Sequence, residues 1–84
     1  MTVRIFGRLR KALRADELEL EAATVGDALG LLRGRLDPAD SPVQQMFDNA
    51  VILVNGRNIR SLSGEDTALG AEDELTVLQQ IAGG

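Results

Sequence analysis

The sequence predicts an α+β fold in which one main helix packs across a mixed sheet of about five strands. Short segments in which residue character alternates with a period of two recur along the chain, and this pattern is typical of strands with one buried face. A single longer segment, residues 25–36, instead repeats its apolar residues at a helical spacing. The 84 residues are enough for one domain with one hydrophobic core.

The first two strands are expected at residues 3–6 and 17–21. In the first, Val3 and Ile5 share one face, and in the second, leucines alternate with glutamates. The connection around residues 9–15 is short and basic. We therefore expect the two strands to pair as an antiparallel hairpin.

The helix is expected to begin after Thr24 and to end near Leu36. The Thr24 side chain can cap the first turn, and the carboxylate of Asp27 suits the positive end of the helix dipole. Proline at position 38 disfavours a helical conformation at the residue before it, which ends the helix. The residues of its apolar stripe are Val25, Ala28, Leu29, Leu32 and Leu36.

The second half of the chain is expected to hold three more strands. Residues 37–49 are mostly polar, with a short helical turn near their end. Residues 51–54 are apolar on both faces, which is typical of a strand covered on both sides or of a strand that contacts a partner. The Asn-Gly pair at residues 55–56 predicts a type I′ turn into a short return strand at 58–60. The last strand is expected at residues 74–78.

The predicted element order, β-β-α-β-β-β, is that of the β-grasp or ubiquitin-like fold. In this fold the first and last strands lie side by side and parallel at the centre of the sheet. We expect residues 1–80 to form this domain, and residues 81–84 to project from one end of the sheet as a flexible Gly-Gly tail.

The composition excludes several classes of function. The sequence contains no cysteine or histidine, so disulfides, thiol nucleophiles and the usual zinc and iron–sulfur sites are excluded, and we expect neither an enzyme nor a bound cofactor. A net charge of −4 and only two aromatic residues argue against nucleic acid as a partner. No segment is apolar enough to span a membrane or to open a signal peptide, and a cytoplasmic location is expected.

The candidate reactive group is the carboxylate of Gly84. Glycine has no Cβ, so Gly83 and Gly84 can pass extended through a narrow channel, and the terminal carbonyl is open to nucleophiles once it is activated. The expected chemistry is adenylation by a partner with ATP, followed by capture of the acyl group by sulfur or an amine. Ala82 is small enough to follow into the channel, and Ile81 either contacts the partner or ends the core strand.

Five segments that span nearly the whole chain resemble those of a known family, the MoaD/ThiS sulfur carriers, and in particular its molybdopterin-synthase small-subunit branch. They are Phe6-Gly7-Arg8-Leu9-Arg10, Thr24-Val25-Gly26-Asp27-Ala28-Leu29, Val51-Ile52-Leu53-Val54-Asn55-Gly56-Arg57, Leu69-Gly70-Ala71-Glu72-Asp73-Glu74-Leu75 and Ile81-Ala82-Gly83-Gly84.

The resemblance implies a carrier that itself catalyses nothing. An adenylating enzyme akin to ubiquitin-activating enzymes would use ATP and magnesium to convert the Gly84 carboxylate to an acyl-adenylate, and a persulfide would supply the sulfur of a thiocarboxylate. The thiocarboxylate would then donate its sulfur inside a second partner, which in this branch is the molybdopterin synthase large subunit or an equivalent acceptor.

The chain departs from the family just before the tail. The family often places two prolines and a valine before Ala-Gly-Gly, where this sequence has Gln79, Gln80 and Ile81. Proline would fix the backbone φ angle, so we expect the two glutamines to leave the tail more flexible and to restore two backbone donors. The sulfur pathway therefore stays open and includes thiamine, cysteine or another thio-cofactor.

Two further groups are candidates for partner binding. Val51, Leu53 and Leu75 can form an exposed apolar patch on the sheet face away from the helix, and the alternative for each is core packing. The guanidinium groups of Arg8 and Arg10 can pair with acids on the activating enzyme, or they can belong to a solvated basic turn.

Two other functions use the same features. A ubiquitin-like modifier would join its activated Gly84 to lysines of other proteins through isopeptide bonds. A pure binding module would use the fold alone, and its terminal glycines would be incidental.

Overall fold

The computed structural model of the chain describes residues 1–79. Two short 3₁₀ turns, η1 and η2, accompany the strands and helices of this part of the chain. The elements in order are β1 (Thr2–Ile5), α1 (Leu9–Leu13), β2 (Glu17–Glu19), α2 (Val25–Arg33), α3 (Ser41–Asp48), β3 (Val51–Val54), β4 (Arg57–Asn58), η1 (Ile59–Ser61), η2 (Gly64–Asp66) and β5 (Glu74–Leu78).

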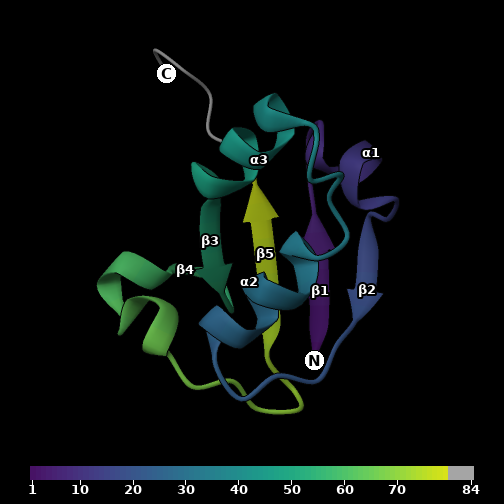
Figure 1. Ribbon diagram of the computed structural model, residues 1–84. Coiled ribbons are helices and arrows are strands. Elements are labelled where there is room, and N and C mark those ends of the chain that lie inside the picture. Colours follow the sequence, from purple (N-terminus) through teal and green to yellow (C-terminus); the bar gives the residue numbers. More distant parts are fainter. Residues whose placement is uncertain (80–84) are drawn as a thin grey trace.

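The strands form one five-stranded sheet in the order β2-β1-β5-β3-β4. Strands β1 and β5 run parallel at its centre, with Val3 opposite Leu75, and the other three neighbouring pairs are antiparallel. Helix α2 crosses the two central strands on one face (Figure 1). The predicted β-grasp topology is therefore confirmed, including the parallel central pair.

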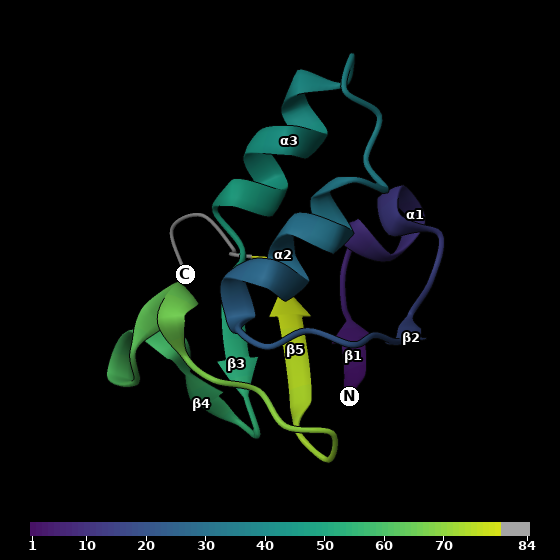
Figure 2. The same ribbon diagram turned by 60° about the horizontal axis from the view of Figure 1, so that its bottom comes forward.

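The hydrophobic core lies between the helices and one face of the sheet. The three long strands contribute alternate residues to it, which are Val3, Ile5, Ile52, Val54, Leu75 and Val77. Every residue of the predicted helical stripe is buried, including Leu36, which follows α2. Helix α3 lies at the end of the sheet where β3 begins, beyond α2 (Figure 1 and Figure 2), and its Phe47 is buried.

Helix α1 is the element that the sequence does not predict. Leu9 and Leu13 lie one helical turn apart and are completely buried, in the connection where the sequence predicts only a basic turn. Arg14 ends the helix in a left-handed conformation, with φ of 61°. Five residues are too short a stretch for a helical period to stand out. The helix is stabilised because both leucines are buried in the hydrophobic core, with α1 next to α3.

Helix α2 begins as predicted. The side-chain oxygen of Thr24 accepts a hydrogen bond from the Asp27 N–H over 3.2 Å. The helix ends at Arg33, earlier than predicted, because the next two backbone bonds, from Arg35 to Leu32 and from Leu36 to Arg33, span three residues and tighten the last turn.

Helix α3 is longer than the single turn that the sequence predicts. An oxygen of Asp40 caps it by accepting a hydrogen bond from the Val43 N–H over 3.1 Å. Pro42 lies in the first turn, where the missing N–H of proline removes no helical hydrogen bond. These two residues start the helix in a segment whose composition is otherwise that of a loop.

The β3–β4 hairpin has the predicted turn and a shorter return strand. Asn55 and Gly56 have φ angles of 52° and 83°, as a type I′ turn requires. The predicted strand at residues 58–60 is wrong beyond Asn58. The side chain of Asn58 accepts a hydrogen bond from the Arg60 N–H over 2.9 Å and turns the chain into η1.

Candidate functional site at the end of the central strand

The predicted reactive end of the chain, Ile81-Ala82-Gly83-Gly84, lies outside the described residues. The described chain runs to Gln79, one residue after β5. The parallel strand β1 ends beside β5, and the antiparallel strand β3 begins on its other side. The surface around this end of β5 is therefore the part of the structure that a partner of the C-terminal segment would meet.

An apolar surface lies at this end of the sheet, on the face away from α2. We call Val51, Leu53 and Leu78 the outer patch. Val51 lies opposite Leu78 in the β3–β5 ladder, and all three side chains are half-buried. Their neighbours in each strand point into the core, so the alternation of a strand places these three on the opposite face. Phe6, which is 46% exposed, follows β1 at the same end, where its N–H donates to the Val77 carbonyl over 3.0 Å.

Of the three residues that the sequence predicts for an apolar patch, two lie on the face away from α2 and the third does not. Val51 and Leu53 lie on the predicted face. Leu75 is completely buried, because its register opposite Val3 turns it toward the core. Leu78 and Phe6 are not among the predicted residues. The alternation within residues 74–78 identifies Leu78, since it puts Leu78 on the face opposite to Leu75.

The part of the outer face on the side of β1 and β2 is polar and internally paired. Nε of Arg4 lies 3.2 Å from Glu74 Oε2 and 3.6 Å from Glu17 Oε1. The Thr2 hydroxyl donates to Glu19 Oε1 over 2.6 Å. The outer face is thus divided, and its apolar part is the one beside the end of β5.

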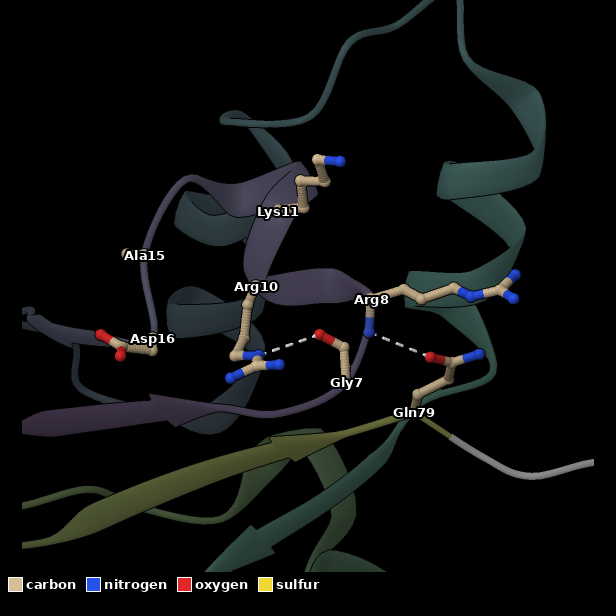
Figure 3. Close-up of a pocket in the computed structure, with 7 residues that line it drawn as sticks. All are labelled: Gly7, Arg8, Arg10, Lys11, Ala15, Asp16 and Gln79. Carbon is tan, nitrogen blue, oxygen red and sulfur yellow. Dashed lines mark hydrogen bonds between the residues drawn. The ribbon is translucent and has the colours of Figure 1, made fainter.

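Both predicted arginines line an open hollow of about 700 Å³ beside the end of β5, which Asp16 and Gln79 also line. Figure 3 shows Arg8, Arg10 and Lys11 among the residues that line this hollow, together with the carboxylate of Asp16. Within residues 1–79 none of these three cations takes part in an ion pair. The structure therefore brings the predicted basic residues to the point where the described chain ends.

The turn between β1 and α1 is in direct contact with Gln79. The Arg8 N–H donates to Gln79 Oε1 over 3.1 Å, and Arg10 Nε donates to the Gly7 carbonyl over 3.2 Å (Figure 3). The sequence predicts that Gln79 loosens the chain relative to a proline. In the structure the side chain of Gln79 is instead held by a hydrogen bond to a residue 71 positions away.

Two further observations bear on the kind of site. Among residues 1–79 no three His, Cys, Asp or Glu side chains come together as a metal ion would require. In the same part of the chain no helix is both long enough and apolar enough to cross a membrane.

Comparisons with known proteins place the chain in a family. The model of the ThiS family matches residues 3–84. The solution structure of small archaeal modifier protein 1 (SAMP1) from Methanosarcina acetivorans is similar, with 33% identity and a TM-score of 0.80 over 99% of this chain and 94% of that one. No curated protein matches the chain.

Two solved complexes contain similar chains. A chain of the BexX/CysO complex from Amycolatopsis orientalis is 25% identical, with a TM-score of 0.75 over 99% of this chain and 98% of that one. A chain in the complex of subunits 1 and 2 of the molybdopterin-converting factor from Helicobacter pylori 26695 shares the fold at 17% identity, with a TM-score of 0.66 over 99% of this chain and 96% of that one. The resemblance found in the sequence is thereby confirmed, and this chain belongs to the ThiS family.

Proposed function

We propose that the chain is a sulfur carrier that is activated at the carboxylate of Gly84. The observation that carries this proposal is the match to the ThiS family, which extends through Gly84 itself. The composition supports it, because a chain without cysteine and histidine brings neither a thiol nucleophile nor an imidazole base. The chain is accordingly a carrier subunit without catalytic activity of its own, and its partners perform the chemistry.

The proposed activation takes place in an adenylating enzyme that uses ATP and magnesium. A carboxylate oxygen of Gly84 attacks the α-phosphorus of ATP, and pyrophosphate leaves. The terminal sulfur of a persulfide then attacks the acyl carbon, and AMP leaves. A thiol of the partner reduces the resulting acyl disulfide, which releases the Gly84 thiocarboxylate and leaves a disulfide on the partner. No cofactor bound to the carrier is needed for any of these steps.

The carrier's own residues present the reactive end. Gly83 and Ala82 make the segment narrow enough for a channel, and Ile81 provides an apolar contact just before it. We assign the outer patch to the docking of partners, because an apolar surface beside the end of β5 lets one protein hold both the sheet and the C-terminal segment. Arg8 and Arg10 fit acidic side chains on the activating enzyme.

We further propose that the sulfur is delivered for molybdopterin synthesis, to the large subunit of molybdopterin synthase. The shared fold with a chain of the Helicobacter pylori molybdopterin-converting factor complex supports this acceptor. The alternative is delivery of the sulfur for thiamine, cysteine or another sulfur-containing product, and the similarity to a chain of the BexX/CysO complex, which holds a different partner, keeps this alternative open. Because the activation consumes ATP, we assign the carrier to the cytoplasm for either acceptor.

A second candidate function is protein modification. It is favoured by one observation, the 33% identity to SAMP1, a small archaeal modifier protein, over nearly the whole of both chains. In that function the same acyl-adenylate of Gly84 is captured by a lysine amine of another protein, and an isopeptide bond forms as AMP leaves.

The test is the intact mass of the chain after incubation with ATP, magnesium, an activating enzyme and a persulfide donor. Replacement of a carboxylate oxygen by sulfur adds about 16 Da, and so does oxidation of a methionine, so fragmentation must map the change to Gly84 rather than to Met1 or Met46. A thiocarboxylate at Gly84 is the expected result. A chain that lacks residues 83–84 is the control and must stay unmodified.

The other outcomes separate the alternatives. Conjugates on other proteins, without a thiocarboxylate, would favour the modifier. A shortened chain that still performs its role in cells would favour the pure binding module. Sulfur transfer from the thiocarboxylate to the large subunit of molybdopterin synthase, compared with transfer to a thiazole synthase or a cysteine-synthase-like enzyme, identifies the acceptor.

A further inference from the structure

The peptide unit between Gly7 and Arg8 is held at both of its ends. Its carbonyl oxygen accepts two hydrogen bonds from Arg10, one from the backbone N–H over 3.3 Å and one from Nε over 3.2 Å. Its N–H donates to Gln79 Oε1 over 3.1 Å. Arg8 is the N-cap residue of α1, and its side chain makes no capping hydrogen bond. The Gln79 side chain thus supplies, from the other end of the chain, an acceptor at the start of this helix.

The contact depends on a glycine at position 7. Gly7 has a φ of +72°, a conformation that residues with a Cβ rarely adopt. A Cβ on Gly7 would lie 3.0 Å from Gln79 Oε1 and 3.2 Å from Gln79 Cβ. The backbone of the turn and the Gln79 side chain are therefore packed so closely that a larger residue at position 7 would displace the Gln79 side chain.

We propose that Gln79 is a positioning residue that fixes the place and direction in which the C-terminal segment leaves the sheet. Strand β5 is held by β1 on one side and by β3 on the other, and this pairing ends at Leu78. The hydrogen bond to Arg8 extends the fixed part of the chain by one residue and draws it toward the β1 side, next to Arg8, Arg10 and Lys11 (Figure 3). The reactive segment thus starts beside the basic turn.

This inference rests on the proposed function for its consequence. A partner that binds both the basic turn and the C-terminal segment then finds the start of the segment at a fixed position relative to the turn. Ordering one more backbone residue before the encounter removes part of the conformational entropy that binding would otherwise lose. Gln79 therefore lowers the KM for the carrier and leaves the rate of adenylation at saturation unchanged.

The test compares two substitutions of Gln79, one that removes the acceptor oxygen and one that keeps it. Gln79→Leu removes the acceptor oxygen with little change in volume, whereas Gln79→Glu keeps an oxygen in place. In the isolated protein, hydrogen exchange at the Arg8 amide and the ¹⁵N order parameter of residue 79 report the contact without any partner. Gln79→Leu is expected to speed exchange at Arg8 about three- to tenfold, and Gln79→Glu is expected to restore the slow exchange.

The second measurement uses the activating enzyme in an ATP–pyrophosphate exchange assay. Gln79→Leu is expected to raise the KM for the carrier about three- to tenfold with kcat unchanged, and Gln79→Glu to keep the KM of the natural sequence. Unchanged exchange at Arg8 in Gln79→Leu would overturn the contact, and an unchanged KM would overturn its positioning role. If the natural sequence is not adenylated at all, the proposed function fails, and the exchange result at Arg8 still decides whether the contact exists.

Discussion

Asn55 donates a hydrogen bond from its side-chain Nδ2 to Asp73 Oδ1 over 2.9 Å and so joins the turn after β3 to the residue before β5. Two more bonds tie the same turn to Glu74, from the Asn55 N–H to the Glu74 carbonyl over 2.8 Å and from the Glu74 N–H to Asn55 Oδ1 over 2.9 Å. The other carboxylate oxygen of Asp73 accepts from the Gly70 N–H over 2.6 Å. Two of the segments that resemble the family, residues 51–57 and 69–75, meet here at the start of β5, away from the outer patch. Their role in this contact is structural.

The carboxylate of Asp73 is expected to make stability depend on pH. Hydrogen bonds to its carboxylate hold the pKa of Asp73 below its ordinary value. The bond from the Gly70 N–H has the larger effect and the bond from the Asn55 side-chain amide the smaller one. A carboxyl group with a lowered folded-state pKa contributes stability that is fully present above the unfolded pKa of about 3.9 and is lost as the pH falls through the folded-state value. Urea unfolding between pH 6 and pH 3 is therefore expected to show a smaller loss of stability in Asp73→Asn than in the natural sequence. Equal losses in both proteins would contradict this role.

Alanine is expected to have opposite effects at two glycines. At Gly7 the φ of +72° and the contact with Gln79 make a Cβ costly, and Gly7→Ala is expected to lower the free energy of unfolding by about 1–3 kcal/mol. At Gly30, inside α2, a Cβ would meet no heavy atom within 4 Å outside the helix's own backbone, and Gly30→Ala is expected to raise the free energy of unfolding by about 0.5–1 kcal/mol. Chemical denaturation measures both changes. A stabilising Gly7→Ala would show that the turn relaxes without strain.

Truncation of one leucine in the core and one in the outer patch is expected to affect different properties, stability in the first case and partner binding in the second. Leu75 is completely buried in the core, and Leu75→Ala is expected to cost about 2–5 kcal/mol of stability. Leu53 lies half-buried on the other face, and Leu53→Ala is expected to cost about 1 kcal/mol while weakening the binding of partners. Thermal unfolding and calorimetric titration with the activating enzyme give the two quantities. Unchanged affinity in Leu53→Ala would place the partner contact elsewhere.

The modifier function can be tested at the single lysine of the chain, because only this side chain can accept an isopeptide bond from a second copy. The sequence contains eight arginines but only one lysine, Lys11, which is exposed on α1 beside the end of β5. Any isopeptide bond between two copies of the chain must therefore join Gly84 of one copy to Lys11 of the other. Lys11→Arg is expected to abolish conjugates between copies and to leave conjugates on other proteins intact, which mass spectrometry of the conjugates checks. Persistence of the self-conjugates would mean that the amine of Met1 is the acceptor.

The parts of the fold that sequence predicts well are those whose signals are local. The cap at Thr24 and the apolar stripe after it belong to one helix. The turn at residues 55–56 is predictable because both of its residues, Asn and Gly, tolerate the positive φ angles that a type I′ turn needs. Helix α1 is not predictable in this way because only the tertiary structure turns two leucines, Leu9 and Leu13, into buried core. The return strand ends early because a side chain, that of Asn58, competes with the sheet for the next backbone N–H.

In the candidate site, too, the features with local signals are predictable from the sequence and the long-range contact is not. The position of Val51 and Leu53 follows from alternation within one strand, and the same alternation, applied to residues 74–78, puts Leu75 in the core and Leu78 on the surface. The contact between Gln79 and Arg8 joins residues 71 positions apart, and no pattern within either segment indicates it. A departure from the family at Gln79 is visible in the sequence, but its physical effect is visible only in the structure.

The central place of β5 has a consequence for how the domain is made. Without residues 74–78 a growing chain has only two separate strand pairs, β1 with β2 and β3 with β4, and isolated two-stranded pairs are marginally stable in water. The sheet can close only after the strand that is synthesised last among the five has left the ribosome. The nascent chain therefore cannot complete its core until residue 78 has left the ribosome. Closing the sheet requires the long-range pairing of β1 with β5, which is slow compared with the folding of helical domains.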